Sequence, residues 1–132
     1  MRLLSLFFLT AVVWSCQSQE KEEGNLSPNM NAGQFQQAIK ENKDAVIIDV
    51  RTPAEVQNGF IEGAINMDIN SPEFADGVAK LDKEKTYFVY CHSGGRSASA
   101  ASYLKKNGIS KVVNLSGGIV GWQRAGLPTV NK

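Results

Sequence analysis

The segment from Cys91 to Ser97 reads CHSGGRS and combines residue types that can activate a thiol for nucleophilic attack. Gly94 and Gly95 can adopt backbone conformations that other residues avoid, so several N–H groups of the segment can turn inward and bind an anion. Arg96 adds a fixed positive charge. A free cysteine is only a few per cent thiolate at neutral pH. The segment therefore predicts a reactive Cys91 that its surroundings hold in the ionised form.

The helix expected after this loop can supply only part of that activation. A helix N-terminus contributes roughly 0.3–1 kcal/mol, and up to about 2 when partly buried. Because one pKa unit corresponds to about 1.4 kcal/mol, the helix alone lowers the pKa of Cys91 by little more than one unit. The inward amides and Arg96 must supply the rest. The alternative is a buried, inert cysteine. It fits poorly, because the loop has two glycines and an arginine and no apolar residue.

Strands and helices alternate on both sides of the loop. Residues 85–90 (KTYFVY) form a mostly apolar run that ends directly on Cys91, which is typical of a strand buried on both faces. Alternation of this kind predicts a three-layer α/β domain with a central parallel sheet and helices on both faces. Ligands of such sheets bind at the carboxyl ends of the strands. The expected strands are residues 45–50, 64–69, 85–90 and 111–115. The expected helices are residues 34–41, 52–59, 97–106 and 119–124, and a further helix is expected to start at 71–73.

Four separated segments occur in a characteristic order. They are Ile48-Asp49-Val50-Arg51 with Glu55, the run GFIEGAIN at 59–66, the loop 91–97, and LSGG at 115–118 with Trp122 and Gly126-Leu127-Pro128. Together they resemble the rhodanese family of sulfurtransferases, in its single-domain form, over residues 29–131. The resemblance implies a rhodanese-like domain at 29–132. One departure is Phe60, where the family usually has histidine, and we expect it to affect packing near the site more than activity.

The resemblance also implies a reaction. Cys91 attacks the outer sulfur of a donor such as thiosulfate and becomes a persulfide, and the sulfur then passes to a thiol or cyanide acceptor. The residues implied are Cys91 and Arg96 for catalysis, His92, Ser93, Gly94, Gly95 and Ser97 for binding the substrate anion, and Asp49, Arg51 and Glu55 for structural support through hydrogen bonds and ion pairs. His92 is either a proton or anion contact or a solvent-facing rim residue. No metal or organic cofactor is expected.

Two other functions use the same loop. Phosphatases built on this fold carry one more residue between cysteine and arginine, whereas Cys91 and Arg96 enclose only four residues here. The shorter ring suits a persulfide sulfur better than a tetrahedral phosphate. A non-catalytic persulfide carrier or binding module, which hands sulfur to a dedicated partner, stays open as the main alternative. If Cys16, the only other cysteine, carries lipid, Cys91 is the only thiol left, and the persulfide must be discharged by an outside acceptor.

Composition limits the remaining partners. A chain of 132 residues is the size of one domain, and 14 basic against 13 acidic residues give no surplus of positive charge for a nucleic acid. Two cysteines and one histidine argue against a zinc–thiolate site or a disulfide scaffold. We expect a monomeric domain without a nucleic-acid partner.

The N-terminal residues have the pattern of an export signal. Arg2 precedes an apolar run at 3–14, which is too short to cross a bilayer as a helix. The run ends just before Cys16, as in bacterial lipoprotein signals, although Trp14 is larger than the residue usual there. We expect residues 1–15 to be a signal peptide and 16–28 a lipid-bearing Cys16 with a flexible tether. The domain is then anchored on the periplasmic side of a bacterial membrane. The alternative is an ordinary secretory signal that leaves Cys16 as a free thiol.

Overall fold

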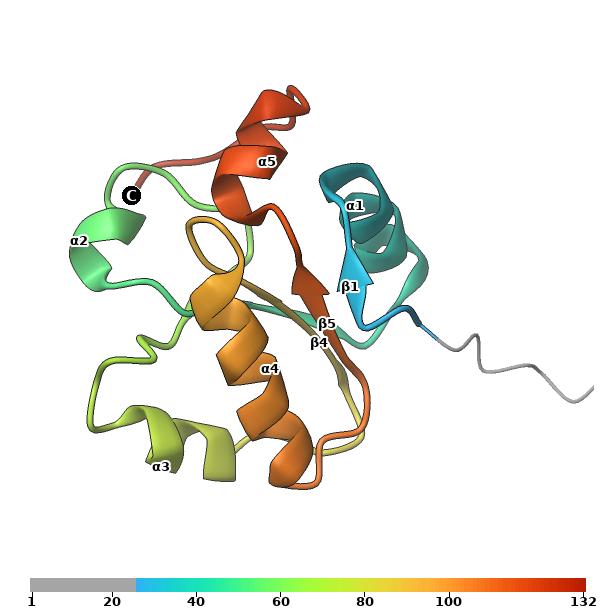
Figure 1. Cartoon of the computed structure of the whole chain (residues 1–132), viewed down its shortest axis with the longest axis vertical. Coiled ribbons are helices and arrows are strands. Elements are labelled where there is room, and N and C mark those ends of the chain that lie inside the picture. The colour runs from blue at the N-terminus through green and yellow to red at the C-terminus, as the bar shows by residue number, and fades with distance from the viewer. Residues whose placement is uncertain (1–25) are drawn as a thin grey trace, which may run out of the picture.

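The computed structural model describes residues 26–132 (Figure 1). The expected signal peptide and the expected lipid-attachment residue Cys16 lie outside the described residues. Leu26 packs against the core, and the Pro28 carbonyl accepts a hydrogen bond from the Asn114 N–H at 2.8 Å. The last residues of the expected tether therefore lie against the domain. No helix within residues 26–132 is long and apolar enough to span a membrane.

A parallel sheet forms the centre of the domain. Its strands are β1 (Asn29–Met30), β2 (Ala45–Asp49), β3 (Ile65–Asn66), β4 (Thr86–Tyr90) and β5 (Val112–Leu115), in the order β1-β5-β4-β2-β3. Every pairing is parallel. All five residues of β4 are buried because this strand lies between β5 and β2 with helices over both faces. The predicted three-layer α/β fold is confirmed.

Helices cover both faces of the sheet. They are α1 (Ala32–Glu41), α2 (Pro53–Val56), α3 (Phe74–Ala79), α4 (Gly95–Lys106) and α5 (Gly118–Arg124). Side chains of α1 and α5 share one apolar core with the sheet, and those of α3 and α4 share a second. Figure 1 shows α1 on one side of the strands and α3 and α4 on the other. Alternate residues of β4 divide between the cores: Tyr90 faces α1 and α5, whereas Cys91, which follows it, faces α4.

Several element boundaries differ from those expected from sequence. Helix α1 begins at Ala32, two residues early, because Asn31 and Gln34 cap it reciprocally. The segment 64–69 is regular strand only at β3, although its N–H groups at Met67 and Ile69 still bond to the carbonyls of Asp49 and Val50. Helix α4 begins at Gly95, and α3 only at Phe74. Strand β1 was not expected, since two residues are too few to show a pattern.

Candidate active site

The Cys91 sulfur lies at the carboxyl end of β4, inside the turn that leads into α4. Cys91 as a whole is only 1% exposed to solvent. The Gly94 N–H donates to Sγ at 3.1 Å, and the Ser97 hydroxyl lies within donating distance at 3.3 Å. Burial raises the pKa of the Cys91 thiol, but hydrogen bonds from the Ser97 hydroxyl and from the N–H groups of Ser97, Gly94 and Ser93 outweigh it and lower the pKa overall. The sulfur is buried among donors that favour the thiolate.

Gly94 is the residue that lets the loop close around the sulfur. Its φ is +109°, a conformation that L side chains rarely adopt. A Cβ at this position would overlap the carbonyl oxygen of Ser116, in the turn after β5. The Gly94 carbonyl in turn accepts the first helical hydrogen bond of α4 from the Ala98 N–H at 3.1 Å. The loop and the start of the helix are thus fixed together.

A second glycine turn holds the other side of the loop. Gly118 has a φ of +59°, and a Cβ there would overlap the His92 carbonyl. Because the two backbones approach so closely, the Ile119 N–H donates to the Cys91 carbonyl at 2.9 Å and the Val120 N–H to the His92 carbonyl at 3.2 Å. The start of α5 therefore fixes the backbone that carries the cysteine.

Arg96 connects the loop to α2. Its guanidinium donates to both carboxylate oxygens of Glu55, at 2.8 and 2.7 Å. The Arg96 hydrogen bonds are the largest influence on Glu55, and with the hydrogen bonds from Thr52 they outweigh burial and lower its pKa to about 2. Hydrogen bonds from Arg96 are not among those that reach the Cys91 sulfur. The structure therefore gives Arg96 the bracing role, and its charge acts on the thiolate through space, partly neutralised by Glu55.

Asp49 and Arg51 form a second, fully buried ion pair. Arg51 Nη2 and Nε donate to the Asp49 carboxylate at 2.7 to 3.1 Å, and Nη2 also donates to the Gly59 carbonyl at 2.8 Å. The guanidinium carbon lies 5.6 Å from the centre of the Tyr90 ring. Burial, and then the nearby Asp49 carboxylate, raise the pKa of Tyr90. This buried pair therefore packs against the Tyr90 ring and ties the end of β2 to the Gly59 carbonyl.

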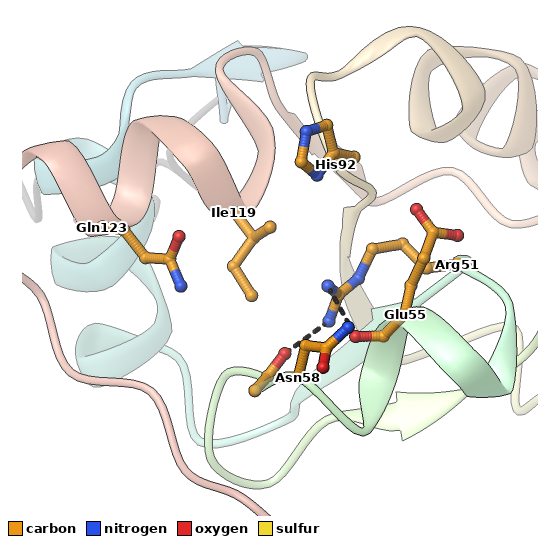
Figure 2. Close-up of a pocket in the computed structure, with 7 residues that line it drawn as sticks. Arg51, Glu55, Asn58, His92, Ile119 and Gln123 are labelled. Carbon is orange, nitrogen blue, oxygen red and sulfur yellow. Dashed lines mark hydrogen bonds between the residues drawn. The ribbon is translucent and has the colours of Figure 1, made fainter.

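A cavity of about 290 Å³ opens beside the loop (Figure 2). Its lining residues are Arg51, Glu55, Asn58, Gly59, His92, Ile119 and Gln123. Figure 2 shows Gln123 and Ile119 of α5 on one side of the hollow and Arg51, Glu55 and Asn58 on the other, with His92 above them. His92 is exposed and directly follows Cys91, so the cavity lies next to the Cys91 loop, although Cys91 is not among its lining residues.

The structure brings most of the predicted site residues to one edge of the sheet. Ser93, Gly94 and Ser97 supply hydrogen bonds to the sulfur, His92 lines the cavity, and Gly95 is the first residue of α4. Sequence reasoning missed Asn114, a buried residue of β5 whose Oδ1 lies 2.6 Å from the Ser97 hydroxyl oxygen. The available indication was a polar residue within the apolar strand VVNL. Residues 26–132 contain no group of His, Cys, Asp and Glu that could hold a metal ion.

Comparison with known proteins identifies the family to which this domain belongs. The model of the rhodanese-like domain family matches residues 31–125. The chain belongs to the rhodanese-like family.

Relatives in sequence and in structure agree with this class. A sulfurtransferase of Allochromatium vinosum is 36% identical over 94 residues, which cover 71% of this chain and 86% of the relative. The thiosulfate sulfurtransferase GlpE of Stutzerimonas stutzeri is 40% identical over 83 residues, 62% of this chain and 73% of that protein. The crystal structure of a rhodanese-related protein from Thermoplasma volcanium superposes with a TM-score of 0.71 at 33% identity, covering 80% of this chain and all of that one.

Proposed function

We propose that this protein is a sulfurtransferase that moves a sulfane sulfur from a thiosulfate-like donor to a thiol or cyanide through a persulfide on Cys91. The observation that carries the proposal is the sulfur itself, buried at the end of β4 and within hydrogen-bond distance of the Gly94 N–H and the Ser97 hydroxyl. Family membership and relatives named as sulfurtransferases support it.

The reaction has two displacements at sulfur. The Cys91 thiolate attacks the outer sulfur of thiosulfate, the S–S bond of the donor breaks, and sulfite leaves with the electron pair. An acceptor thiolate or cyanide then attacks the outer sulfur of the persulfide, and the Cys91 thiolate is the leaving group. The same inward N–H groups stabilise the anion in both steps, on the inner sulfur before the first step and on the outer sulfur of the persulfide after it. The cavity beside His92 has room for the small molecules that the two steps require.

Intact-mass spectrometry after thiosulfate treatment tests the first step. The chain should gain one sulfur atom, lose it again on addition of a reductant, and gain none when Cys91→Ser is introduced. A parallel Cys16→Ser variant should still gain the sulfur, because Cys16 is the only other cysteine. If the Cys91→Ser variant still gained one sulfur atom, the proposal would be refuted.

Addition of cyanide tests the second step. Repeated release of thiocyanate identifies an enzyme, whereas a single stoichiometric release identifies a carrier that needs a dedicated partner. Hydrolysis of an aryl phosphate that depends on Cys91 would instead favour the phosphatase reaction.

We also propose that the chain is exported and held at the periplasmic side of a bacterial membrane by lipid on Cys16. The support is the order of Arg2, an apolar run and a cysteine followed by polar residues. Metabolic labelling with a fatty acid in a bacterial host should mark the wild-type chain and leave Cys16→Ser unlabelled. Equal labelling of the two, or recovery of both in the cytoplasmic fraction, would contradict the proposal.

A further inference from the structure

The Ser97 hydroxyl has more acceptors around it than it has hydrogens. Its oxygen lies 2.6 Å from Asn114 Oδ1, 3.2 Å from the Gly94 carbonyl oxygen and 3.3 Å from Cys91 Sγ. A serine hydroxyl has one hydrogen to donate. Ser97 is 0% exposed and Asn114 is 4% exposed, so bulk water does not provide the missing donors.

The neighbours of Asn114 fix the orientation of its amide. Its Nδ2 donates to the Gly94 carbonyl at 3.4 Å and to Asn29 Oδ1 at 3.1 Å. A backbone carbonyl can only accept, so the NH₂ group must face Gly94 and the Oδ1 atom must face Ser97. An amide oxygen cannot donate. The 2.6 Å contact therefore needs the hydrogen of the Ser97 hydroxyl.

The two protonation states of Cys91 place different demands on that hydrogen. With a neutral thiol, S–H donates to the Ser97 oxygen and the Ser97 hydroxyl donates to Asn114, so each group has a partner. A thiolate attracts the Ser97 hydrogen more strongly than a thiol does, and when this hydrogen turns toward Sγ the buried Asn114 Oδ1 is left without a donor. Leaving a buried acceptor unpaired is costly. Asn114 therefore opposes the ionisation that the loop amides favour.

We propose that Asn114 is a positioning residue that competes with the Cys91 sulfur for the hydrogen of the Ser97 hydroxyl. The competition itself follows from the hydrogen-bond geometry, and its role during sulfur transfer rests on the proposed function. The hydrogen turns to Sγ when Cys91 is the free thiolate, and it returns to Asn114 when the persulfide forms and the inner sulfur is no longer an anion. The hydrogen stays bonded to the Ser97 oxygen throughout, so no proton is transferred.

Few charged groups lie around Cys91 to mask this effect. On α4, Arg96 acts on the sulfur through space, and it is paired with Glu55 of α2 and influenced by Asp68. His92, next in the chain, is exposed. Strand β5 carries no charged residue. Replacing Asn114 by an apolar residue therefore changes the hydrogen-bond balance without changing any charge.

The test is the pKa of Cys91, read from the ultraviolet absorbance of the thiolate in the full chain carrying Cys16→Ser. Asn114→Val, which places a β-branched residue with high strand propensity at this position, should lower this pKa by about one unit, giving up to tenfold more thiolate at a fixed pH below the pKa. Ser97→Ala should raise it. In the Ser97→Ala background, Asn114→Val should have no effect, because the hydrogen for which the two groups compete is gone.

Two controls separate this role from simple loss of structure. Ser116→Ala removes a hydroxyl that bonds the Met30 carbonyl just after β5 and should leave the pKa of Cys91 unchanged. If Asn114→Val is not folded by circular dichroism, Asn114→Ala replaces it in the same comparison. An unchanged or raised pKa in a folded Asn114 variant, or the same shift with and without the Ser97 hydroxyl, would overturn the proposal. The absorbance needs no sulfur donor, so the result holds even if sulfur transfer is not observed.

Discussion

The ion pair between Arg96 and Glu55 should make the stability of the domain depend on pH in a defined way. Glu55→Gln removes the negative charge but keeps a side-chain oxygen, so the helix cap with Thr52 is retained. The variant loses the negative charge and, because an amide nitrogen cannot accept, also the acceptor of one of the two guanidinium hydrogen bonds. The change therefore isolates the ion pair that braces the Cys91 loop against α2.

The magnitude follows from the pKa of Glu55 and from its exposure. Fully realised, a pKa lowered from 4.5 to about 2 corresponds to about 3 kcal/mol. However, the side chains of Arg96 and Glu55 are 32% and 33% exposed, so solvent screens the pair and reduces its contribution. We expect Glu55→Gln to lower the free energy of unfolding at pH 7 by about 1 kcal/mol. In a domain of this size, that is a fall in Tm of about 4–8 °C.

The pH dependence has a definite sign. Because the pKa of Glu55 is lower in the folded state, the stabilisation is complete above about 4.5 and is lost as the pH falls toward 2. Urea unfolding of the wild type and of Glu55→Gln should therefore differ at pH 7 and converge between pH 4.5 and 2. Glu62→Gln, at an exposed glutamate that forms no ion pair within residues 26–132, is the matched control. A difference that persists at low pH, or one that Glu62→Gln reproduces, would refute the reasoning.

Two further substitutions test the backbone and the buried charges. Gly94→Ala should lower the free energy of unfolding by at least about 2–3 kcal/mol, because of its φ of +109° and the overlap with Ser116; Gly63→Ala, at +82° but in open space, should cost only about 1 kcal/mol. Equal losses in urea unfolding would show that the overlap is relieved. Asp49→Asn leaves the Arg51 charge buried without its partner and should cost about 3–5 kcal/mol, measured by thermal melting. A loss below 1 kcal/mol would show that the charge finds another partner.

Much of the fold could be predicted from local pattern. The runs at β2 and β4 are continuous and rich in β-branched or aromatic residues, as expected of strands covered on both faces. The capping box of Thr52 and Glu55, with Pro53 between them, marks the start of α2. The strand order and the short strand β1 could not be predicted, because both depend on pairing between segments that are distant in the chain.

The site, too, has a part that could be predicted from the sequence and a part that could not. The loop of six residues from Cys91 to Arg96 is continuous in sequence, so its thiol, glycines and charge could be identified directly. The partner of Arg96 could not be, since Glu55 lies 41 residues away. Asn114 was missed for the same reason: its contact with Ser97 exists only because β5 lies beside β4 and α4 packs over both.

The sequence by itself determined the cysteine, the glycine-containing loop that follows it and the parallel sheet that carries both, because local backbone preferences and hydrophobic pattern specify these features over a few consecutive residues. Only the tertiary structure decided which groups surround the thiol. The donors are the Gly94 N–H and the Ser97 hydroxyl, Arg96 turns to Glu55, and Asn114 contends for the Ser97 hydrogen. These contacts depend on distances of a few ångströms between elements that are separate in sequence. The packing of the two cores sets those distances, and no local sequence pattern specifies them.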